Sequence, residues 1–505
     1  MTNFIMETLL RLKNAVRDVT KNEITDENFI EKEIREWKSS IERSDMITGE
    51  KYYIGLHDIL SRKRTAIGDK GDLVEIENLP NNRIVDNQYK KMVDQKVNYL
   101  VGKPLTISTI NDSYNKALVD VYNKRFLKVF RNVGEDSYNC GKGWLYPYYN
   151  EQGEFTFKRI KPYEFKASWK DDEHTILDYG IRVYDVIELR GTNERYKEKV
   201  EVYTEDGVDY FDLTNSGKIV PCEPYHTNYF TSNENIGFNW LKIPIICFKY
   251  NSKEIPLIKH VKSLQDGINL IESNFQNNME EDARNTIMVL VNYDGEKLGE
   301  FRRNLATYGA VKVKNTPNFP NGDVKTLQVA VDSENYKAIL QIFKKALIEN
   351  AMGYDAKDDR MGANPNQMNI QSMYNDIDMD ANGTETEYQQ ALEQLNWFVN
   401  CHLKNIGKGD FFNENVDFIF NRDTLINETE VIDNCVKLEG MLSKKTIISQ
   451  IPWVNDVDKE LELIEDEREE EDPFMGDNDE LLATESGRFR KPDIQPKQEE
   501  LQENR

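Results

Sequence analysis

The sequence predicts a mainly helical α+β fold, and three observations predict it. Residues 143–250 contain short runs of alternating apolar and polar residues, separated by turns rich in Asp, Gly and Asn, which is typical of antiparallel strands. The stretches before and after this region place apolar residues at helical spacing. The most regular of them, at 257–275, continues for more than two heptads. We therefore expect helical parts on both sides of one β region.

The composition excludes several classes of protein. The chain has 505 residues, 39% of them hydrophobic, which is enough for roughly three domains with packed cores. No apolar run approaches the roughly 18 residues that a membrane span needs, so we expect no membrane association. The net charge of −24 argues against a general coat for nucleic acid but leaves room for a small local DNA contact. Five widely spaced cysteines favour free thiols in a reducing compartment.

The N-terminal part shows two helical stretches. Residues 1–70 are charged and helical in pattern, and a second helix is predicted over 83–101. Gly102 and Pro104 end this second helix, because glycine suits the cap and proline cannot continue it. Its apolar face has Lys96 as the only charged interruption.

The heptad helix over 257–283 presents an apolar seam at spacings of four and three residues. Its opposite face is polar and includes Gln265 and Asn277, and Gly267 stands where a better helix former is expected. The pattern is equally compatible with a surface helix of an ordinary core and with a helix packed against neighbours in an assembly. The seam consists of Leu257, Val261, Leu264, Ile268, Ile271 and Phe275.

A small β-α-β-β insert follows, with strands at 287–291, 310–313 and 324–329 and a helix at 296–305. A helix over 332–352 comes after the insert. The helix over 257–283, the small insert and the helix that returns over 332–352 together predict a stalk.

The rest of the chain is predicted to be helical after one polar loop. The loop spans 353–368, and the helix that follows over 369–404 contains Asn382-Gly383, where a kink or break is expected. Three shorter helices follow up to residue 470. Residues 456–505 carry 19 acidic and 7 basic residues, a net charge of −12, and we expect the tail from 471 to be disordered.

The only candidate catalytic cluster is acidic. Asp355, Asp358 and Asp359, with Asp376, Asp378 and Asp380, are conceivable as a two-metal nuclease site. However, the second group falls at i, i+2 and i+4 on a helix, so its middle carboxylate points away from the other two. We therefore interpret these residues as solvated carboxylates and expect neither a metal nor a cofactor. The sequence favours an assembly protein over an enzyme.

Several short segments, taken in order, give the chain a family resemblance. The chain resembles the portal proteins of tailed bacteriophages, and most closely those of phages with long non-contractile tails. The segments are YYIGLHDIL at 52–60, RIVDNQYKKMVDQKVNYLVGKP at 83–104, IPIICFKYN at 243–251, VKSLQDGIN at 261–269, FNRD at 420–423, SKKT at 443–446, PWVND at 452–456 and ELELIE at 460–465.

The resemblance implies a division into functional parts. It assigns 1–255 to a wing, 256–284 and 332–352 to two stem helices, 285–331 to a clip, 353–368 to a tunnel loop, 369–404 to a long wing helix, 405–470 to a helical crown and 471–505 to the acidic tail. It also implies a ring, of twelve subunits in this family, that sits at one capsid vertex of the virion and conducts double-stranded DNA during packaging and ejection.

The resemblance also implies partners and site residues. The partners are the terminase large subunit, the head–tail connector (adaptor) protein, and the major capsid and scaffolding proteins, met in the host cytoplasm during assembly. The candidates for DNA contact in the tunnel loop are Lys357, Arg360, Asn364 and Asn366. The candidates for partner binding in the clip are Arg302, Arg303 and Tyr308, for which ion pairs between ring subunits are an equal alternative. Two other functions stay open, namely a metal-dependent DNA-processing enzyme and a structural head protein that forms no ring.

Overall fold

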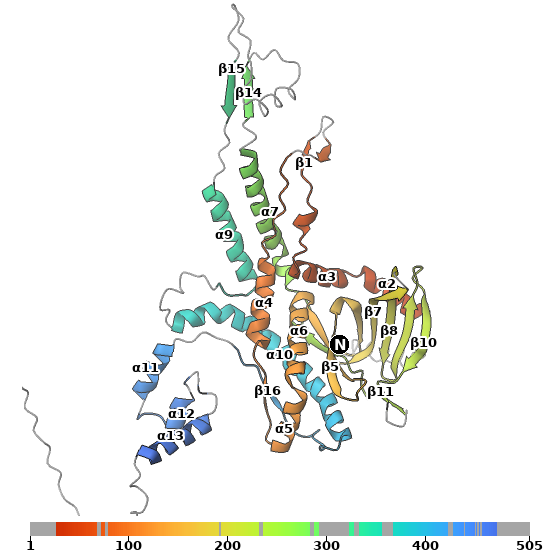
Figure 1. Ribbon diagram of the computed structural model, residues 1–505, viewed down its shortest axis with the longest axis vertical. Helices are drawn as coiled ribbons and strands as arrows, with labels where there is room; N and C mark the ends of the chain where they lie inside the picture. The colour runs from red at the N-terminus through yellow and green to blue at the C-terminus, as the bar shows by residue number, and fades with distance from the viewer. Residues whose placement is uncertain are drawn as a thin grey trace, which may run out of the picture. The chain divides into compact units, whose positions relative to one another are not determined.

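The computed structural model describes most of the chain, in two compact units. The described residues are 27–67, 72–75, 79–190, 193–231, 236–282, 287–291, 323–327, 333–355, 367–422, 428–438, 440–449, 451, 454 and 457–471. The first unit ends at Leu425 and the second begins at Ile426. Figure 1 shows the elements of both units.

The described N-terminal part is helical only up to Tyr53. Helices α2 (Glu27–Ser39) and α3 (Ile41–Tyr53) meet at Ser40, whose side chain accepts a hydrogen bond from Arg43 N and so caps α3. The prediction of helix up to residue 70 is wrong beyond this point. A short 3₁₀ turn (Asp58–Ser61) leads instead into a hairpin of β1 (Thr65–Ile67) and β2 (Leu73–Glu75).

Three helices and one short strand come next. They are α4 (Gln88–Val101), β3 (Thr106–Ser108), α5 (Asp112–Val121) and α6 (Lys124–Cys140). Asparagine side chains cap each helix, at Asn87, Asn111 and Asn123. The second helix therefore starts at Gln88 and not at residue 83, because Asn87 caps it and the preceding residues are extended.

The predicted antiparallel β region is confirmed, and it forms two main sheets. The smaller sheet has the order β13-β4-β5, and the larger has the order β10-β9-β8-β7-β6. The strands are β4 (Lys142–Tyr149), β5 (Phe155–Ile160), β6 (Phe165–Trp169), β7 (Leu177–Arg190), β8 (Asn193–Thr204), β9 (Gly207–Leu213), β10 (Ile219–Thr227) and β13 (Ile246–Lys249). Two further short strands, β11 (Phe230–Thr231) and β12 (Gly237–Phe238), pair with each other.

Two long helices run side by side after the sheets (Figure 1). They are α7 (Ile258–Asp282) and α9 (Ser333–Asn350), so the predicted heptad helix and the returning helix are both confirmed. Strands β14 (Ile287–Val291) and β15 (Asp323–Leu327) lie between them in the chain and pair antiparallel. The expected helix at 296–305 and strand at 310–313 lie outside the described residues.

Helix α10 (Gln367–Asn405) is the longest described helix and continues through Gly383 without a break. The expected break is therefore wrong. The helix is held on both sides of the glycine, since Ala381 and Tyr388 are buried. Strand β16 (Asp417–Ile419) then pairs with β3 in the first unit, so the range 405–470 is not wholly helical.

The second unit contains the three predicted short helices. They are α11 (Glu428–Leu438), α12 (Lys444–Ile448) and α13 (Val457–Glu471). Ser443 caps α12 by accepting a hydrogen bond from Thr446 N. The expected disordered tail from 471 lies, apart from Glu471, outside the described residues.

The apolar cores lie within the first unit. The main core joins α4, α6, α7 and α10 with the smaller sheet, and a second cluster lies between α2 and the larger sheet. All five cysteines are free. Among the described residues, no helix is long and apolar enough to cross a membrane.

Candidate functional site

The predicted seam of α7 packs inside the chain. Leu257, Val261 and Ile268 are buried in the main core, and Leu264 packs against it from the edge. Phe275 contacts Tyr336 of α9, with ring centroids 5.1 Å apart. Of the two interpretations that the pattern allows, the described structure therefore supports packing of the seam within one subunit. Ile271 and Phe275 line a small apolar hollow of about 360 Å³ together with Ile84, Tyr336 and Leu340.

Gly267 lets α7 and α9 approach closely. A Cβ atom added at this position would lie 2.5 Å from Cε1 of Phe343 on α9. Real Cβ atoms essentially never come so close to another heavy atom. A side chain at this position would therefore displace the Phe343 ring, so the glycine that weakens the helix in the sequence pattern allows the close packing of α9.

One polar face of α7 is buried, and we call the four side chains on it the ladder. Gln265, Asn269, Ser273 and Asn277 follow one another every four residues, and each is at most 2% exposed. They accept hydrogen bonds from backbone N–H groups of the segment at 82–86, which precedes α4, and of Tyr89 in the first turn of α4. The bonds run from Tyr89 N to Gln265 Oε1 (2.9 Å), Asp86 N to Asn269 Oδ1 (3.1 Å), Ile84 N to Ser273 Oγ (2.9 Å) and Asn82 N to Asn277 Oδ1 (2.7 Å).

His57 ties this ladder to α3. Its Nδ1 accepts a hydrogen bond from Nδ2 of Asn269 (2.7 Å), while its Nε2 donates to the carbonyl oxygen of Tyr52 (2.9 Å). Burial lowers the pKa of His57, which favours this neutral tautomer. Lys344 of α9 adds an ion pair to Asp86 (2.5 Å). The extended segment is thus joined to α3, α7 and α9.

Helix α4 holds the residues at which α9 ends. Met352 adopts the left-handed backbone conformation (φ 50°), so the chain leaves the path of α9 at this residue. The side-chain amide of Gln95 then binds both backbone groups of Tyr354, donating to its carbonyl oxygen (2.9 Å) and accepting from its N–H (3.1 Å). The Tyr354 ring stacks on Tyr374 of α10, with centroids 4.6 Å apart. The start of the 353–368 segment is therefore held by two helices.

Lys96, the charged interruption of the α4 face, forms a buried ion pair. Its Nζ lies 2.7 Å from Oδ2 of Asp380 on α10 and donates to the carbonyl oxygen of Met352 (3.2 Å). The Tyr250 hydroxyl donates to the other Asp380 oxygen (2.7 Å). Burial lowers the pKa of Lys96, while the Asp380 carboxylate acts in the opposite direction.

The interpretation of the acidic residues on α10 as solvated carboxylates is wrong for Asp380, whereas the Asp378 side chain is 39% exposed. Asp380 is the buried partner of Lys96, and Asp378 accepts a hydrogen bond from the Tyr99 hydroxyl and lies 3.5 Å from Arg422. Asp376 is exposed. Within the described ranges, no three His, Cys, Asp or Glu side chains form a group that could hold a metal ion. Asp358 and Asp359 lie outside those ranges.

The remaining predicted site residues are not described. Residues 292–322 and 356–366 lie outside the described part of the chain. They include the clip candidates Arg302, Arg303 and Tyr308 and the loop candidates Lys357, Arg360, Asn364 and Asn366. Their roles stay predictions.

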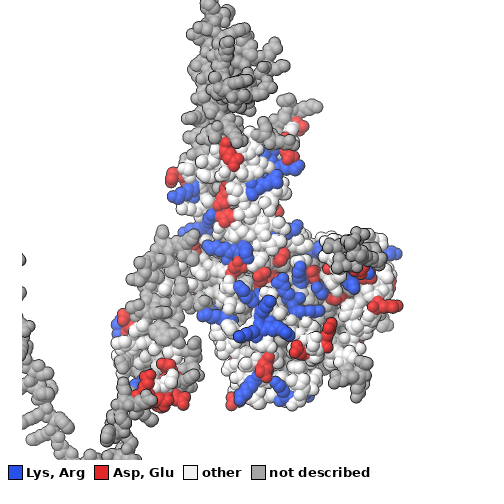
Figure 2. All heavy atoms as spheres, viewed as in Figure 1, with Lys and Arg blue, Asp and Glu red and all other residues white. Residues whose placement is uncertain are grey.

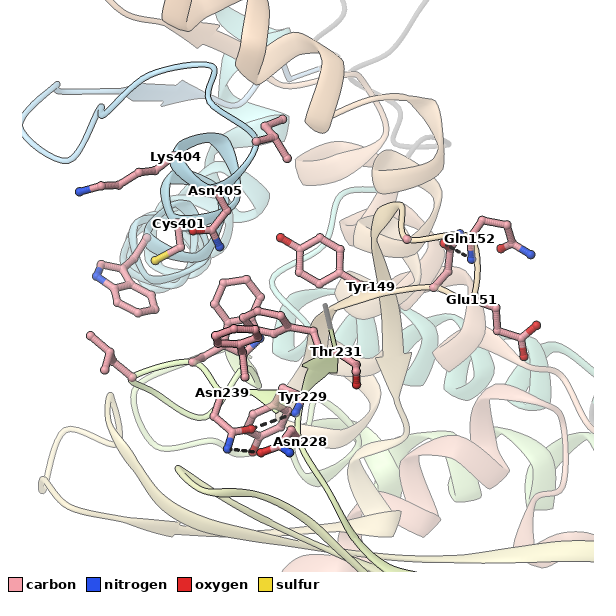
Figure 3. Close-up of a pocket in the computed structure, with 18 of the residues that line it drawn as sticks. Tyr149, Glu151, Gln152, Asn228, Tyr229, Thr231, Asn239, Cys401, Lys404 and Asn405 are labelled. Atoms are coloured by element: carbon pink, nitrogen blue, oxygen red, sulfur yellow. Dashed lines mark hydrogen bonds between the residues drawn. The ribbon is translucent and has the colours of Figure 1, made fainter. Parts of the chain in front are cut away.

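Sequence reasoning missed an aromatic groove at the end of α10 (Figure 3). The groove has a volume of about 1180 Å³, and Tyr149 lies at its wall with its hydroxyl 2.9 Å from Nδ1 of His402. Asn239 orders one rim, accepting from Tyr229 N (3.0 Å) and donating to Asn228 Oδ1 (2.8 Å). Its aromatic lining comes from separate segments, so no local pattern could reveal it. The lining aromatic residues are Tyr149, Tyr229, Phe230, Phe238, Trp240, Trp397 and Phe412.

Known proteins resemble this chain over most of its length. The family described as phage portal protein, SPP1 Gp6-like, matches residues 32–473. The chain belongs to this family of phage portal proteins. It is 26% identical over 454 residues to the portal protein of Bacillus phage SPP1, covering 88% of this chain and 86% of that protein. It is 25% identical over 439 residues to the portal protein of Clostridium phage phiCD119, covering 84% and 93%.

Membership of the portal family confirms the resemblance found in the sequence, and with it the function of a phage portal protein. The match begins within α2 and ends just after α13, so it includes the paired helices and the supports described above. The buried polar side chains of α4, α7 and α10 agree with a structural role, because they form hydrogen bonds and ion pairs with other groups of the same chain.

Proposed function

We propose that copies of this chain form a closed ring at one vertex of the capsid, with double-stranded DNA passing through it during packaging and ejection. Twelve copies is the number that the family resemblance implies. In this proposal α7 and α9 form the stem, 285–331 the clip, 353–368 the tunnel loop, α10 the long wing helix and 405–470 the crown. The ring stands in the virion and assembles in the host cytoplasm.

The observation that carries the proposal is the exposed apolar surface of the paired helices. Leu270 and Met279 on α7 are 42% and 52% exposed, and Ile339 and Ile342 on α9 are 45% and 65% exposed. The seam of α7 is already occupied within the chain, and these four side chains remain exposed on the outside of the helix pair. A pair of helices with apolar residues on its outside is suited to contact with other copies.

The support of the 353–368 segment fits a loop that touches DNA. Gln95 and the Tyr374 ring hold Tyr354, and Lys96 binds the carbonyl oxygen of Met352 just before the segment, so the described start of the segment is fixed in place. Lys357, Arg360, Asn364 and Asn366 are proposed to contact the passing duplex. A largely acidic wall around them would let the duplex slide, because each neutralised phosphate strengthens binding.

The clip is proposed to dock the terminase large subunit and later the head–tail connector protein through Arg302, Arg303 and Tyr308. The major capsid and scaffolding proteins are proposed to contact the outside of the ring. Replacing both arginines by alanine is expected to weaken binding of the motor without changing the mass of the ring.

Native mass and electron microscopy test the proposal. Twelve copies of 59.0 kDa give a particle of about 700 kDa, and images should show a central hole. The double variant Ile339→Asp/Ile342→Asp should reduce the particle to small species, whereas Ile187→Asp, on the larger sheet and 52% exposed, should leave the ring intact. A stable 59.0 kDa species at all concentrations would contradict the ring and favour a structural head protein that forms none.

A further inference from the structure

A row of three cations lies on the exposed face of α6. Lys124, Lys128 and Arg131 are all exposed, and their spacing of four and three residues places them on one face of the helix. They span about 10 Å along the helix axis. Figure 2 shows Lys and Arg side chains gathered over the region of α4 and α6. We call these three residues the basic row.

The start of α6 is an unfavourable place for cations. The helix begins with Lys124 and Arg125 and contains no acidic residue before Glu135. The N-terminal end of a helix carries a partial positive charge, so basic side chains in the first turn are electrostatically disfavoured there. Residues that break a local rule of stability without an evident local gain are commonly found at functional sites.

Neighbouring carboxylates neutralise little of this charge. In the described part of the chain, Lys124 and Lys128 form no ion pair, and Nη2 of Arg131 donates to the neutral Oδ1 of Asn98 on α4 (2.7 Å). Glu135, one turn beyond, accepts a hydrogen bond from the Tyr53 hydroxyl (3.0 Å). The basic row is therefore a local positive excess in a chain whose net charge is −24.

The chemistry of the row favours phosphate over a protein partner. Centres of protein interfaces are depleted in lysine and enriched in aromatic residues, and the α6 aromatics Phe126 and Phe130 are buried. Lysine, arginine and asparagine side chains are common contacts of DNA phosphates. Duplex DNA carries one negative charge per about 1.7 Å of its axis, so a 10 Å row faces about six charges.

We propose that the basic row binds the phosphate backbone of double-stranded DNA, at a site separate from the 353–368 segment. The choice of duplex DNA as the polyanion rests on the proposed function of the chain. The contact is independent of base sequence and sensitive to salt, because it consists of charge contacts to phosphate. In a ring, each copy would supply one such row.

The test compares two triple variants of the full chain in binding a fluorescent 20-base-pair duplex between 50 and 200 mM salt. Lys124→Gln/Lys128→Gln/Arg131→Gln removes the row. Lys32→Gln/Lys63→Gln/Lys404→Gln removes three cations that are 68%, 67% and 55% exposed elsewhere, so both variants have the same net charge. Fluorescence anisotropy gives the dissociation constant at each salt concentration.

The row variant should bind at least tenfold more weakly at 100 mM salt, with a salt slope smaller by about 2 to 3, since each phosphate contact contributes about 0.9. The control variant should keep the slope of the native chain. Lys128→Gln alone should lower the slope by about 0.9, which keeps the test available if the triple variant fails to fold.

Equal losses in the two triple variants, or unchanged binding by the row variant, would overturn the proposal. Competition by poly-glutamate as effective as competition by unlabelled duplex would also overturn it and would assign the row to an acidic protein. Native mass is measured on the same samples. A ring whose row variant binds DNA normally contradicts this proposal alone, whereas a chain that forms no ring contradicts the proposed function.

Discussion

Lys96 interrupts the apolar face of α4, and its side chain is fully buried beside Asp380, which is 6% exposed. A buried ion pair is weak evidence of net stabilisation, but removing one partner leaves an uncompensated charge in the core. The pair joins α4 to α10 and also reaches the end of α9 through Met352. It therefore holds α4 against α9 and α10, the two helices between which the 353–368 segment lies.

Lys96→Met is expected to lower the free energy of unfolding by about 3 to 5 kcal/mol, because Asp380 is left buried without its cation. Lys90→Met on the same helix breaks the exposed pair with Asp94 and should cost less than about 1 kcal/mol. Adding Asp380→Asn to Lys96→Met should recover part of the loss. Urea unfolding of the three variants measures these differences, and equal effects of the two single variants would contradict the assignment.

Asp136 on α6 gives the first unit a dependence on pH. Burial raises the pKa of its carboxyl to about 8, against the opposing charge of Arg159, whose Nη1 lies 3.5 Å away. The folded chain then keeps a proton that the unfolded chain releases near pH 4, so stability falls as the pH rises from about 4 to 8.

The urea midpoint of the native chain should therefore be lower at pH 8 than at pH 5. The side chain at position 136 does not titrate in Asp136→Asn, so the urea midpoint of this variant should fall less between pH 5 and pH 8. Measuring both chains at pH 5, 6.5 and 8 checks the expectation. A parallel fall in the two chains would mean that other groups cause the pH dependence.

At the scale of elements, the buried ladder on α7 supplies the hydrogen-bond acceptors that backbone N–H groups in a sheet find on a neighbouring strand. The backbone N–H groups of 82–89 bind side chains spaced one helical turn apart, and Asn269 also contacts His57. Asn269→Ala should lower the free energy of unfolding by about 1 to 3 kcal/mol, since the Asp86 N–H loses its acceptor.

Gln276→Ala is the matched control on the same helix, because Gln276 is exposed and donates a hydrogen bond to the exposed Glu280. It should change stability by less than about 0.5 kcal/mol. Limited proteolysis gives a local measurement for both variants. Faster cleavage between residues 60 and 85 is expected in Asn269→Ala alone, and equal cleavage rates would argue against the ladder as the support of this segment.

Two glycines in helices should respond oppositely to alanine. Gly267→Ala forces Phe343 out of its position and should cost about 1 to 3 kcal/mol despite the better helix propensity of alanine. A Cβ atom at Gly383 of α10 would meet nothing within 4 Å, so Gly383→Ala should stabilise by about 0.5 to 1 kcal/mol. Thermal unfolding of both variants compares the signs, and stabilisation by Gly267→Ala would contradict the close packing.

At the scale of the whole molecule, the described core clusters lie in the first unit, while half of the net negative charge lies in the last 50 residues of the second. All three core clusters fall between Ile30 and Phe420. Half of the net charge of −24 lies in residues 456–505, within the second unit. The first unit therefore contains its own apolar cores.

A chain that ends at Leu425 should fold by itself. Its circular dichroism should retain the strand signal and most of the helix signal, and its melting temperature should lie within a few degrees of that of the full chain. Aggregation of this shorter chain under conditions in which the full chain is soluble would show that the second unit contributes to folding.

Periodicity along the chain predicted the antiparallel β region, the heptad helix and the returning helix, because periodicity is a local property. It missed the short strands β1, β2, β3 and β16, which are too short to show a pattern. The segment order of the sequence also resembled the portal family to which the chain belongs. The start of α4 at Gln88 and the continuity of α10 were missed. Asn87 caps α4 locally, but partners distant in the sequence hold the residues before it and the helix around Gly383. Asn269 binds the segment before α4, and the core packs around Gly383 on both sides.

Only the tertiary structure decided what the polar residues in the helices do. Lys96 and Asp380 are 284 positions apart in the sequence, and Asp86 and Asn269 are 183 apart. Apolar periodicity contains no information about which buried polar groups will meet, since a buried polar side chain and a solvated one look alike in a pattern. The need to satisfy hydrogen bonds and charges inside the core joins these residues, and that need exists only when the chain is folded.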